Sequence, residues 1–293
     1  MILLVVCFLL GASASLCCYF LTPMADSLWN LLWLILMVPT GFALSFGLYL
    51  VCLLFWGFTV NTKKVRDKPS KIALWNLTQG ATGACFFCRA HIKVTGLEKL
   101  PKNQKVMYVS NHLSNFDQLA MLTAFDGYHT IFVSKPENFN IVVAGPLIAK
   151  AGYIPINRED AFEGVKSIRK AADFIKNDQY SVGICPEGTR SKDHEFHEFH
   201  HGSFKIALWG KCPIVVLGIQ NTWAIAKRFP WRSTKVYIDI LEVIPYEEFA
   251  DKKTPEISDH CHKVIEEYLE KNRHRDYRFR GKKGSISSNE EVK

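Results

Sequence analysis

The sequence predicts a membrane-anchored α/β protein, in which a mixed central sheet flanked by helices follows an N-terminal hydrophobic helical anchor. Two observations predict this fold class. Asp26 is the only charged side chain between Met1 and Thr62, so nearly all 36 basic and 28 acidic residues fall in the rest of the chain. From Lys71 onward, short β-rich runs alternate with amphipathic helical segments. A freely soluble, one-piece protein is therefore excluded, and we divide the chain into an anchor (1–62), an α/β domain (63–272) and a basic, disordered tail (273–293).

The anchor contains two apolar runs. Residues 2–21 have about the 20 residues that one bilayer crossing needs. Residues 28–60 would form a helix about 50 Å long, which exceeds one crossing. We therefore expect two or three helices, with a break at Pro39-Thr40-Gly41. A cleaved signal peptide is the alternative for residues 2–21, although the basic n-region is missing apart from the amino terminus.

The segment after the anchor indicates which side of the membrane the domain faces. Residues 61–71 carry five basic side chains and one acidic side chain, Asp67. By the positive-inside rule, this flank is cytoplasmic. The nine cysteines are scattered and odd in number, so they predict no disulfide framework, and the single Cys85-x-x-Cys88 is expected to pack at the membrane surface rather than to bind zinc. We expect a membrane protein with a cytoplasmic domain, in a bacterial inner membrane in preference to the endoplasmic reticulum.

Behind the anchor, five runs are expected to be strands: 105–110, 130–134, 180–185, 213–218 and 235–243. Between them, apolar residues recur at steps of three and four from Phe162 to Ile175, which predicts a helix with Glu159 and Asp160 near its start. The basic segment 271–283 can either attract the domain to anionic lipid or remain a solvated tail.

The first chemical motif is Asn111-His112-x4-Asp117, placed where an apolar strand ends and a helix, 118–125, begins. On one continuous helix, the two side chains would point about 140° apart. They can meet only if the chain turns between them, and Ser114 or Asn115 is a suitable N-cap for that turn. An aspartate bonded to one ring nitrogen leaves the other as a general base. Alone, this spacing favours a structural histidine.

Two further motifs carry arginines. Pro186-Glu187-Gly188-Thr189-Arg190-Ser191 follows another strand, where glycine lets backbone N–H groups approach an anion and arginine can grip a phosphate. Gly152-x5-Arg158 brings a second arginine to a strand-like segment. Taken singly, each arginine would more often be a surface residue.

In this order, and with the Pro-Ile strand at Pro213, the motifs resemble the four-motif glycerolipid acyltransferases, and most of all the 1-acylglycerol-3-phosphate acyltransferases. The resemblance spans residues 85–220 and includes Gly202-Ser-Phe-Lys205. It implies transfer of a fatty acyl group from acyl-CoA or acyl carrier protein to the 2-hydroxyl of lysophosphatidate, which gives phosphatidate. No further cofactor and no metal are implied, and we expect membrane phospholipids but no nucleic acid as partners.

The resemblance also implies a role for each matching residue. His112 would be the general base and Asp117 would orient it. The acceptor phosphate would be bound by Lys135, Arg158, Gly188, Thr189 and Arg190, with Glu187 ordering their loop and Pro213 on the acyl-donor side. The sequence departs from the pattern at three binding-surface positions, Pro155, Cys185 and Val216, which leaves acceptor identity and chain length open.

Three alternatives compete with this hypothesis. His197-Glu-Phe-His-His201 formally fits the H-E-x-x-H pattern of zinc proteases, but Gly202 and Ser203 follow at once and no apolar helical face surrounds it. A non-catalytic lipid-binding protein would have no need of both members of the catalytic pair. Glycerol-3-phosphate or another lysophospholipid remains open as the acceptor.

Overall fold

The computed structural model describes residues 1–279 except 23–31, 63, 65, 158–159 and 191–195. The chain forms two compact units: residues 1–84 with 133–163, and residues 85–132 with the chain from Gly164 onward. We call them the anchor unit and the catalytic-domain unit. The anchor, predicted as residues 1–62, therefore shares its unit with residues up to Ala84 and with the segment 133–163.

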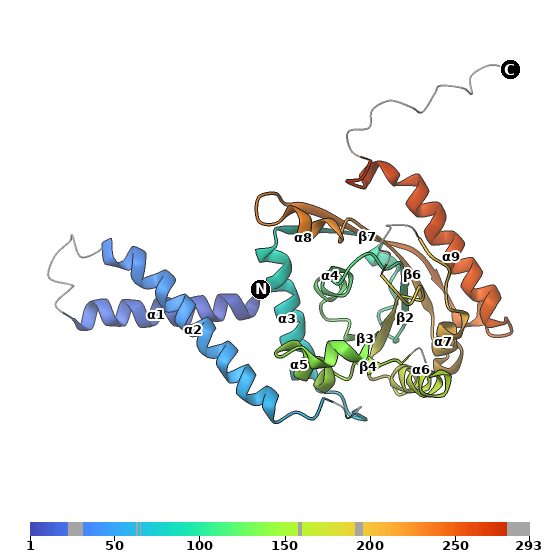
Figure 1. Ribbon diagram of the computed structural model, residues 1–293, viewed down its shortest axis with the longest axis horizontal. Helices are drawn as coiled ribbons and strands as arrows, with labels where there is room; N and C mark the ends of the chain where they lie inside the picture. The colour runs from blue at the N-terminus through green and yellow to red at the C-terminus, as the bar shows by residue number, and fades with distance from the viewer. Residues whose placement is uncertain (23–31, 63, 65, 158–159, 191–195, 280–293) are drawn as a thin grey trace, which may run out of the picture. The chain divides into compact units, whose positions relative to one another are not determined.

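Elements are labelled as in Figure 1. The helices are α1 (Ile2–Leu21), α2 (Trp33–Phe58), α3 (Lys71–Phe87), α4 (Phe116–Ala124), α5 (Ala144–Ala151), α6 (Ala161–Lys176), α7 (Lys205–Gly210), α8 (Ala224–Arg228) and α9 (Thr254–Lys271). The strands are β1 (Ala90–Thr95), β2 (Met107–Ser110), β3 (Thr130–Ser134), β4 (Ile154–Pro155), β5 (Ser181–Ile184), β6 (Ile214–Gln220) and β7 (Thr234–Ile244). Short 3₁₀ turns lie at Leu97–Lys99, Pro136–Asn140, His201–Phe204, Tyr246–Glu248 and Arg273–Arg275.

In the anchor unit, α1 and α2 are both long and apolar enough to cross a membrane. They cross at two glycines: a Cβ added to Gly11 would lie 2.3 Å from the Gly41 carbonyl carbon. Ser15 Oγ donates to Met37 O across the same contact, at 2.7 Å. Small residues and interhelical hydrogen bonds of this kind hold helices together in lipid.

The expected break at Pro39 is wrong, because α2 continues through it. Proline removes one backbone donor from the helix. The remaining backbone hydrogen bonds hold the 26 residues in one helix. Thr40 Oγ1 donates to Leu36 O at 2.7 Å and so adds a side-chain bond in this turn.

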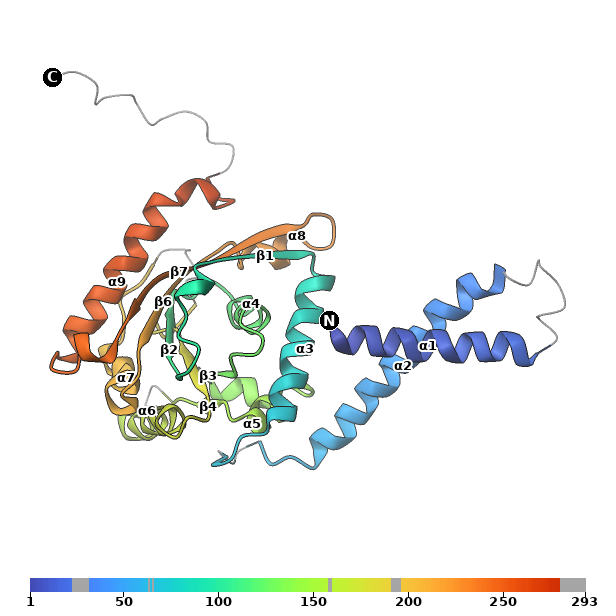
Figure 2. The same ribbon diagram turned by 180° about the vertical axis from the view of Figure 1, so that it is seen from behind.

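The strands form one mixed sheet in the order β1-β7-β6-β2-β5-β3-β4. Every pair is parallel except β6 with β7. All seven residues of β6 are buried, as expected for a strand covered on both faces. Figures 1 and 2 show α4 on one face of the sheet and α7 and α9 on the other.

The fold class and the five expected strands are confirmed, and the expected helix is α6. Because β2 is parallel to both β5 and β6, the carboxyl ends of these three strands meet at one edge of the sheet. The loops that leave this edge begin at Asn111, Cys185 and Asn221. In open α/β sheets, ligands bind at this edge.

Candidate active site

His112 and Asp117 meet because the chain turns between the end of β2 and the start of α4. The His112 Nδ1 and Asp117 Oδ2 atoms are 2.7 Å apart. The same oxygen accepts the backbone N–H groups of Leu113 (2.7 Å) and Ser114 (2.9 Å), which fixes the carboxylate at the first turn of the helix. Asn115 is the N-cap of α4 without a side-chain bond, and Ser114 Oγ accepts from Phe116 N. The turn expected from the sequence is confirmed.

The second oxygen of Asp117 is held by Thr222, which lies just beyond the end of β6. Thr222 Oγ1 donates a short hydrogen bond to Asp117 Oδ1. Both side chains are fully buried, so the bond is shielded from water. With three acceptor bonds on Oδ2 and one on Oδ1, the carboxylate has a single orientation. It accepts from Nδ1–H of His112, which leaves Nε2 as the basic nitrogen.

Asn111 joins the ends of β2 and β6. Its side-chain Nδ2 donates to Ile219 O at 2.9 Å, and Ile219 N donates to its Oδ1 at 2.8 Å. The backbone pairing of β2 with β6 ends at Ser110. The buried Asn111 amide continues this hydrogen bonding by one residue, because it both donates and accepts. The His112 backbone is therefore anchored on one side by β6.

Glu187 anchors the same backbone from the other side. Its Oε1 accepts the N–H of His112 at 2.6 Å, and its Oε2 accepts the N–H of His197 at 3.2 Å. The side chain is buried. Glu187 therefore links the loop after β2 to the loop after β5 through two charge-assisted bonds.

Two of the titratable groups beside this edge, His112 and Glu187, have shifted pKa values. Burial lowers the pKa of His112, but its contacts with Cys185 and Asp117 raise it by more, so that it lies well above the ordinary 6.5. Burial raises the pKa of Glu187 to about 7, against the bonds from His112 N and His197 N. Shifted pKa values are typical of catalytic groups, whose charge state has to suit a proton transfer.

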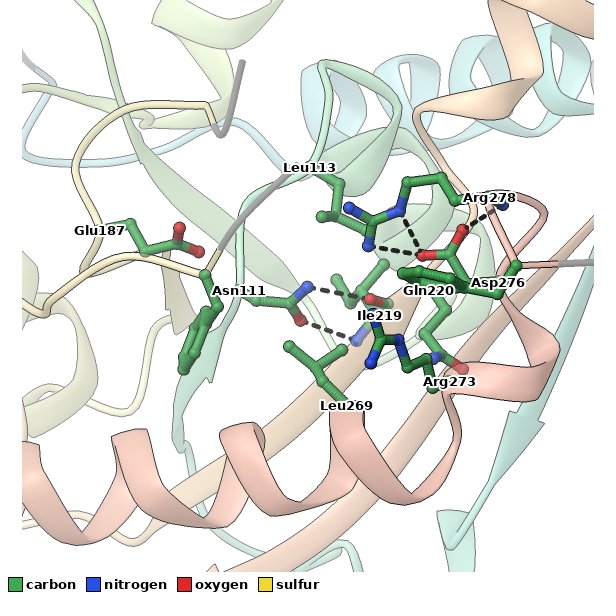
Figure 3. Close-up of a pocket in the computed structure, with 11 residues that line it drawn as sticks. Asn111, Leu113, Glu187, Ile219, Gln220, Leu269, Arg273, Asp276 and Arg278 are labelled. Carbon is green, nitrogen blue, oxygen red and sulfur yellow. Dashed lines mark hydrogen bonds and ion pairs between the residues drawn. The ribbon is translucent and has the colours of Figure 1, made fainter. Parts of the chain in front are cut away.

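A pocket of about 50 Å³ lies beside this edge, and Figure 3 shows side chains that line it. Asn111, Leu113 and Glu187 come from the motif loops, and Arg273 and Arg278 from the C-terminal segment. Arg278 is bonded to Asp276 through Nε and Nη2, at 2.9 and 2.7 Å. The volume suits a few water molecules rather than a lipid chain.

The C-terminal segment 272–279, which the sequence places mostly in a disordered tail, is part of the fold. Arg275 Nη1 forms an ion pair with Asp239 Oδ2 at 2.8 Å. Asn221 Nδ2 donates to Arg275 O at 3.0 Å, and Tyr277 N donates to Asn221 Oδ1 at 3.2 Å. Because Asn221 precedes Thr222, this segment supports the loop that holds Asp117.

The other predicted site residues are placed as follows. Gly188 is buried with φ +77°, in a turn closed by Gly188 N to Cys185 O, whereas Thr189 and Arg190 are exposed beside it. Pro213 precedes β6 at its amino end, about 20 Å along the strand from the level of His112, so the structure does not bring the two together. Lys135 is exposed after β3 in the anchor unit. Arg158 lies outside the described residues.

Within the described part of the chain, no group of three or more His, Cys, Asp or Glu side chains could hold a metal ion. Residues 196–200 of the His-rich segment form no helix, and His201–Phe204 is a single 3₁₀ turn. The H-E-x-x-H pattern requires a helix that carries both histidines, and these residues do not form one.

Residues 91–220 match the family described as Acyltransferase. The match covers less than half of the chain. The matched region holds His112, Asp117 and Glu187, and it ends two residues before Thr222. Thr222 and the C-terminal segment were missed by sequence reasoning, because nothing local marks them as part of the site.

Curated relatives have a more specific name. The chain is 35% identical over 133 residues to the chloroplastic 1-acyl-sn-glycerol-3-phosphate acyltransferase BAT2 of Brassica napus, which covers 45% of this chain and 38% of that relative. It is 26% identical over 170 residues to the 1-acyl-sn-glycerol-3-phosphate acyltransferase alpha of Ovis aries, covering 57% and 59%. In both cases the match spans less than two thirds of the relative's length.

A solved structure shares the fold. The crystal structure of the 1-acyl-sn-glycerophosphate (LPA) acyltransferase PlsC from Thermotoga maritima matches with a TM-score of 0.59 and 23% sequence identity. The match covers 77% of this chain and 89% of that one. At this identity, the likeness shows a shared fold alone.

Proposed function

We propose that this protein is a 1-acyl-sn-glycerol-3-phosphate acyltransferase of phospholipid biosynthesis. It transfers a fatty acyl group from acyl-CoA or acyl carrier protein to the 2-hydroxyl of lysophosphatidate, giving phosphatidate. The observation that carries the proposal is the pairing of the partly buried His112 with the buried Asp117 at the carboxyl edge of the sheet. The names of the curated relatives support the choice of lysophosphatidate as the acceptor.

The mechanism follows from the geometry of the pair. Neutral His112 takes the proton of the acceptor hydroxyl at Nε2 while the hydroxyl oxygen attacks the thioester carbonyl. Asp117 holds the ring through Nδ1–H and stabilises the imidazolium that forms. When the tetrahedral intermediate collapses, the C–S bond breaks and the thiolate takes the proton from Nε2. The chain's own side chains thus complete a proton cycle without a covalent acyl-enzyme.

The acceptor phosphate requires fixed cations and backbone donors. We assign it to Lys135, Arg158, Gly188, Thr189 and Arg190, with Glu187 holding the loop in place. The exposed Arg190 side chain next to the positive-φ turn of Gly188 supports this assignment, because such a turn directs backbone N–H groups at an anion. The apolar helices α1 and α2 associate the chain with the membrane, where the acceptor resides, and the basic flank places the catalytic-domain unit on the cytoplasmic face.

The deciding experiment is an acyl-transfer assay on the purified protein in detergent. Lysophosphatidate, glycerol-3-phosphate and a second lysophospholipid are each offered with acyl-CoA or with acyl carrier protein. We expect phosphatidate from lysophosphatidate, and formation about 10²- to 10⁴-fold slower with the His112→Ala variant. Equal or faster acylation of another acceptor would overturn the assigned substrate, and full activity of His112→Ala would overturn the mechanism.

A further inference from the structure

Four exposed aromatic side chains gather at one end of the catalytic-domain unit. They are Phe86 (57% exposed), Phe87 (51%), Phe229 (46%) and Trp231 (85%). Phe86 and Phe87 end α3, and the other two lie in the loop between α8 and β7. We call these four residues the aromatic patch. In water, aromatic surface of this size is unfavourable, and clustered exposure of this kind marks an interaction site.

Hydrogen bonds from the Arg89 side chain to the loop backbone hold the two halves of the aromatic patch together. Arg89 Nη1 donates to Pro230 O at 3.2 Å and to Trp231 O at 3.4 Å. Just beyond, β1 and β7 pair in parallel from Ala90 opposite Thr234, so the chain enters both strands from the same end. Figures 1 and 2 both show the loop after α8 beside the end of α3.

The loop is held in its projecting shape from within. Arg228 Nε donates to Ser233 O at 3.0 Å, and Arg232 N donates to Arg228 O at 2.8 Å. These bonds close the turn at both of its ends. Trp231 is therefore presented to solvent by a fixed turn, which lowers the entropy lost when it binds a partner.

The surroundings of the aromatic patch carry charge of one sign. Segments 85–95 and 222–238 contain no Asp or Glu and six basic residues: Arg89, Lys93, Lys227, Arg228, Arg232 and Lys235. All of these side chains except that of Arg228 lie on exposed residues. Aromatic rings surrounded by Lys and Arg match the interface of an anionic bilayer, where Trp lies at headgroup level and basic groups meet lipid phosphates.

We propose that the aromatic patch and its basic surroundings form a membrane-contact surface, which inserts Trp231 and Phe229 into the headgroup region of an anionic phospholipid leaflet. This contact is separate from the apolar helices α1 and α2, because it belongs to the catalytic-domain unit. A second copy of the chain fits the surface less well, since two such basic surfaces would repel each other. The inference concerns lipid contact and does not depend on the proposed reaction.

Fluorine NMR on the full-length protein tests this inference directly. The protein is labelled with 5-fluorotryptophan and placed in nanodiscs of phosphatidylcholine with phosphatidylglycerol, and a lipid spin-labelled near its headgroup is added. The Trp231 resonance is assigned by its loss in Trp231→Phe. We expect the spin label to broaden the Trp231 resonance severalfold and to leave that of Trp209, on α7, nearly unchanged.

A charge-matched pair of variants tests the basic surroundings. Arg232→Glu/Lys235→Glu reverses two charges beside the aromatic patch, whereas Lys252→Glu/Lys253→Glu reverses two exposed charges elsewhere in the same unit. Only the first pair should reduce the broadening of Trp231 to the level seen in pure phosphatidylcholine discs. The proposal would be overturned if Trp209 and Trp231 were broadened equally, if neither were broadened, or if both double variants had equal effects. It would also be overturned if Trp231 became protected from the spin label as the protein concentration rises.

Discussion

At the scale of single residues, the site depends on how firmly His112 is oriented. Asp117, Glu187 and Asn111 fix its ring and its backbone from three sides. Replacing the base with His112→Ala should lower kcat by about 10²- to 10⁴-fold, the usual contribution of a general base. His91→Ala, at an exposed position of β1, is the matched control and should retain full activity. A similar loss in both variants would show that the effect is not specific to the base.

Thr222 gives a second prediction at this scale. Thr222→Val keeps the side-chain volume but removes the donor to Asp117 Oδ1, which leaves a buried acceptor unpaired. We expect stability to fall by about 1–3 kcal/mol and kcat to fall without a matching rise in KM. Thr222→Ser restores the hydroxyl and should recover most of the activity. If Thr222→Ser is as impaired as Thr222→Val, the hydroxyl does not position Asp117.

The raised pKa of His112 predicts the pH dependence. The base must be neutral, so kcat/KM should rise with pH along a limb that lies above pH 6.5. Cys185→Ala removes one cause of the raised pKa, so the His112 pKa falls and the limb moves to lower pH. A pH–rate profile of both proteins measures this shift. A limb that stays in place or moves to higher pH would contradict the assigned cause.

The sequence predicts a contact within the site when the two residues are close together along the chain, and misses it when they are far apart. His112 and Asp117 are five residues apart, so their meeting follows from one turn and a strand end. Thr222 is 105 residues from Asp117, and only the parallel pairing of β2 with β6 brings them together. The role expected of Pro213 depended on the resemblance alone, and register places it at the far end of β6.

At the scale of elements, apolar β-branched runs such as 214–219 are predicted well, because a strand buried on both faces has a continuous apolar sequence. The strand β1 was missed, although its residues alternate between half-buried and exposed at the edge of the sheet, which is a pattern typical of a strand. The two-residue strand β4 is too short to leave a pattern. The helix break at Pro39 was wrong because local propensity yields to the bonds of a long helix.

The crossing of α1 and α2 gives a prediction at this scale. Gly41→Leu would force a side chain into the Gly11 backbone and should separate the two helices. Gly47→Leu is the matched control. Gly47 lies on the same helix, and a Cβ added there would have no atom within 4 Å. Disulfide trapping between cysteines introduced on the two helices measures their contact. We expect the trapped yield to fall only for Gly41→Leu, and equal yields for both variants would contradict the crossing.

At the scale of the whole molecule, the C-terminal segment completes the site without contributing a base or an acid. Through Asn221 it supports Thr222, and Thr222 supports Asp117. A chain that ends after Asn272 should therefore lose kcat, while one that ends after Phe279 keeps these contacts and should keep kcat. Acyl-transfer assays with a matched measurement of Tm compare the two. Equal activity of both truncated chains would show that the segment does not support the site.

The pairing of β1 with β7 has a consequence for synthesis of the protein. The first strand of the sheet finds its partner more than 130 residues later in the chain, at Thr234–Ile244. While the ribosome makes the intervening residues, the backbone N–H and C=O groups of β1 are unpaired. Strands in this state can pair with neighbouring chains and aggregate. His91 and Lys93 lie on its exposed face and act as gatekeepers against such aggregation. The alternation of polar residues along β1 thus protects the nascent chain.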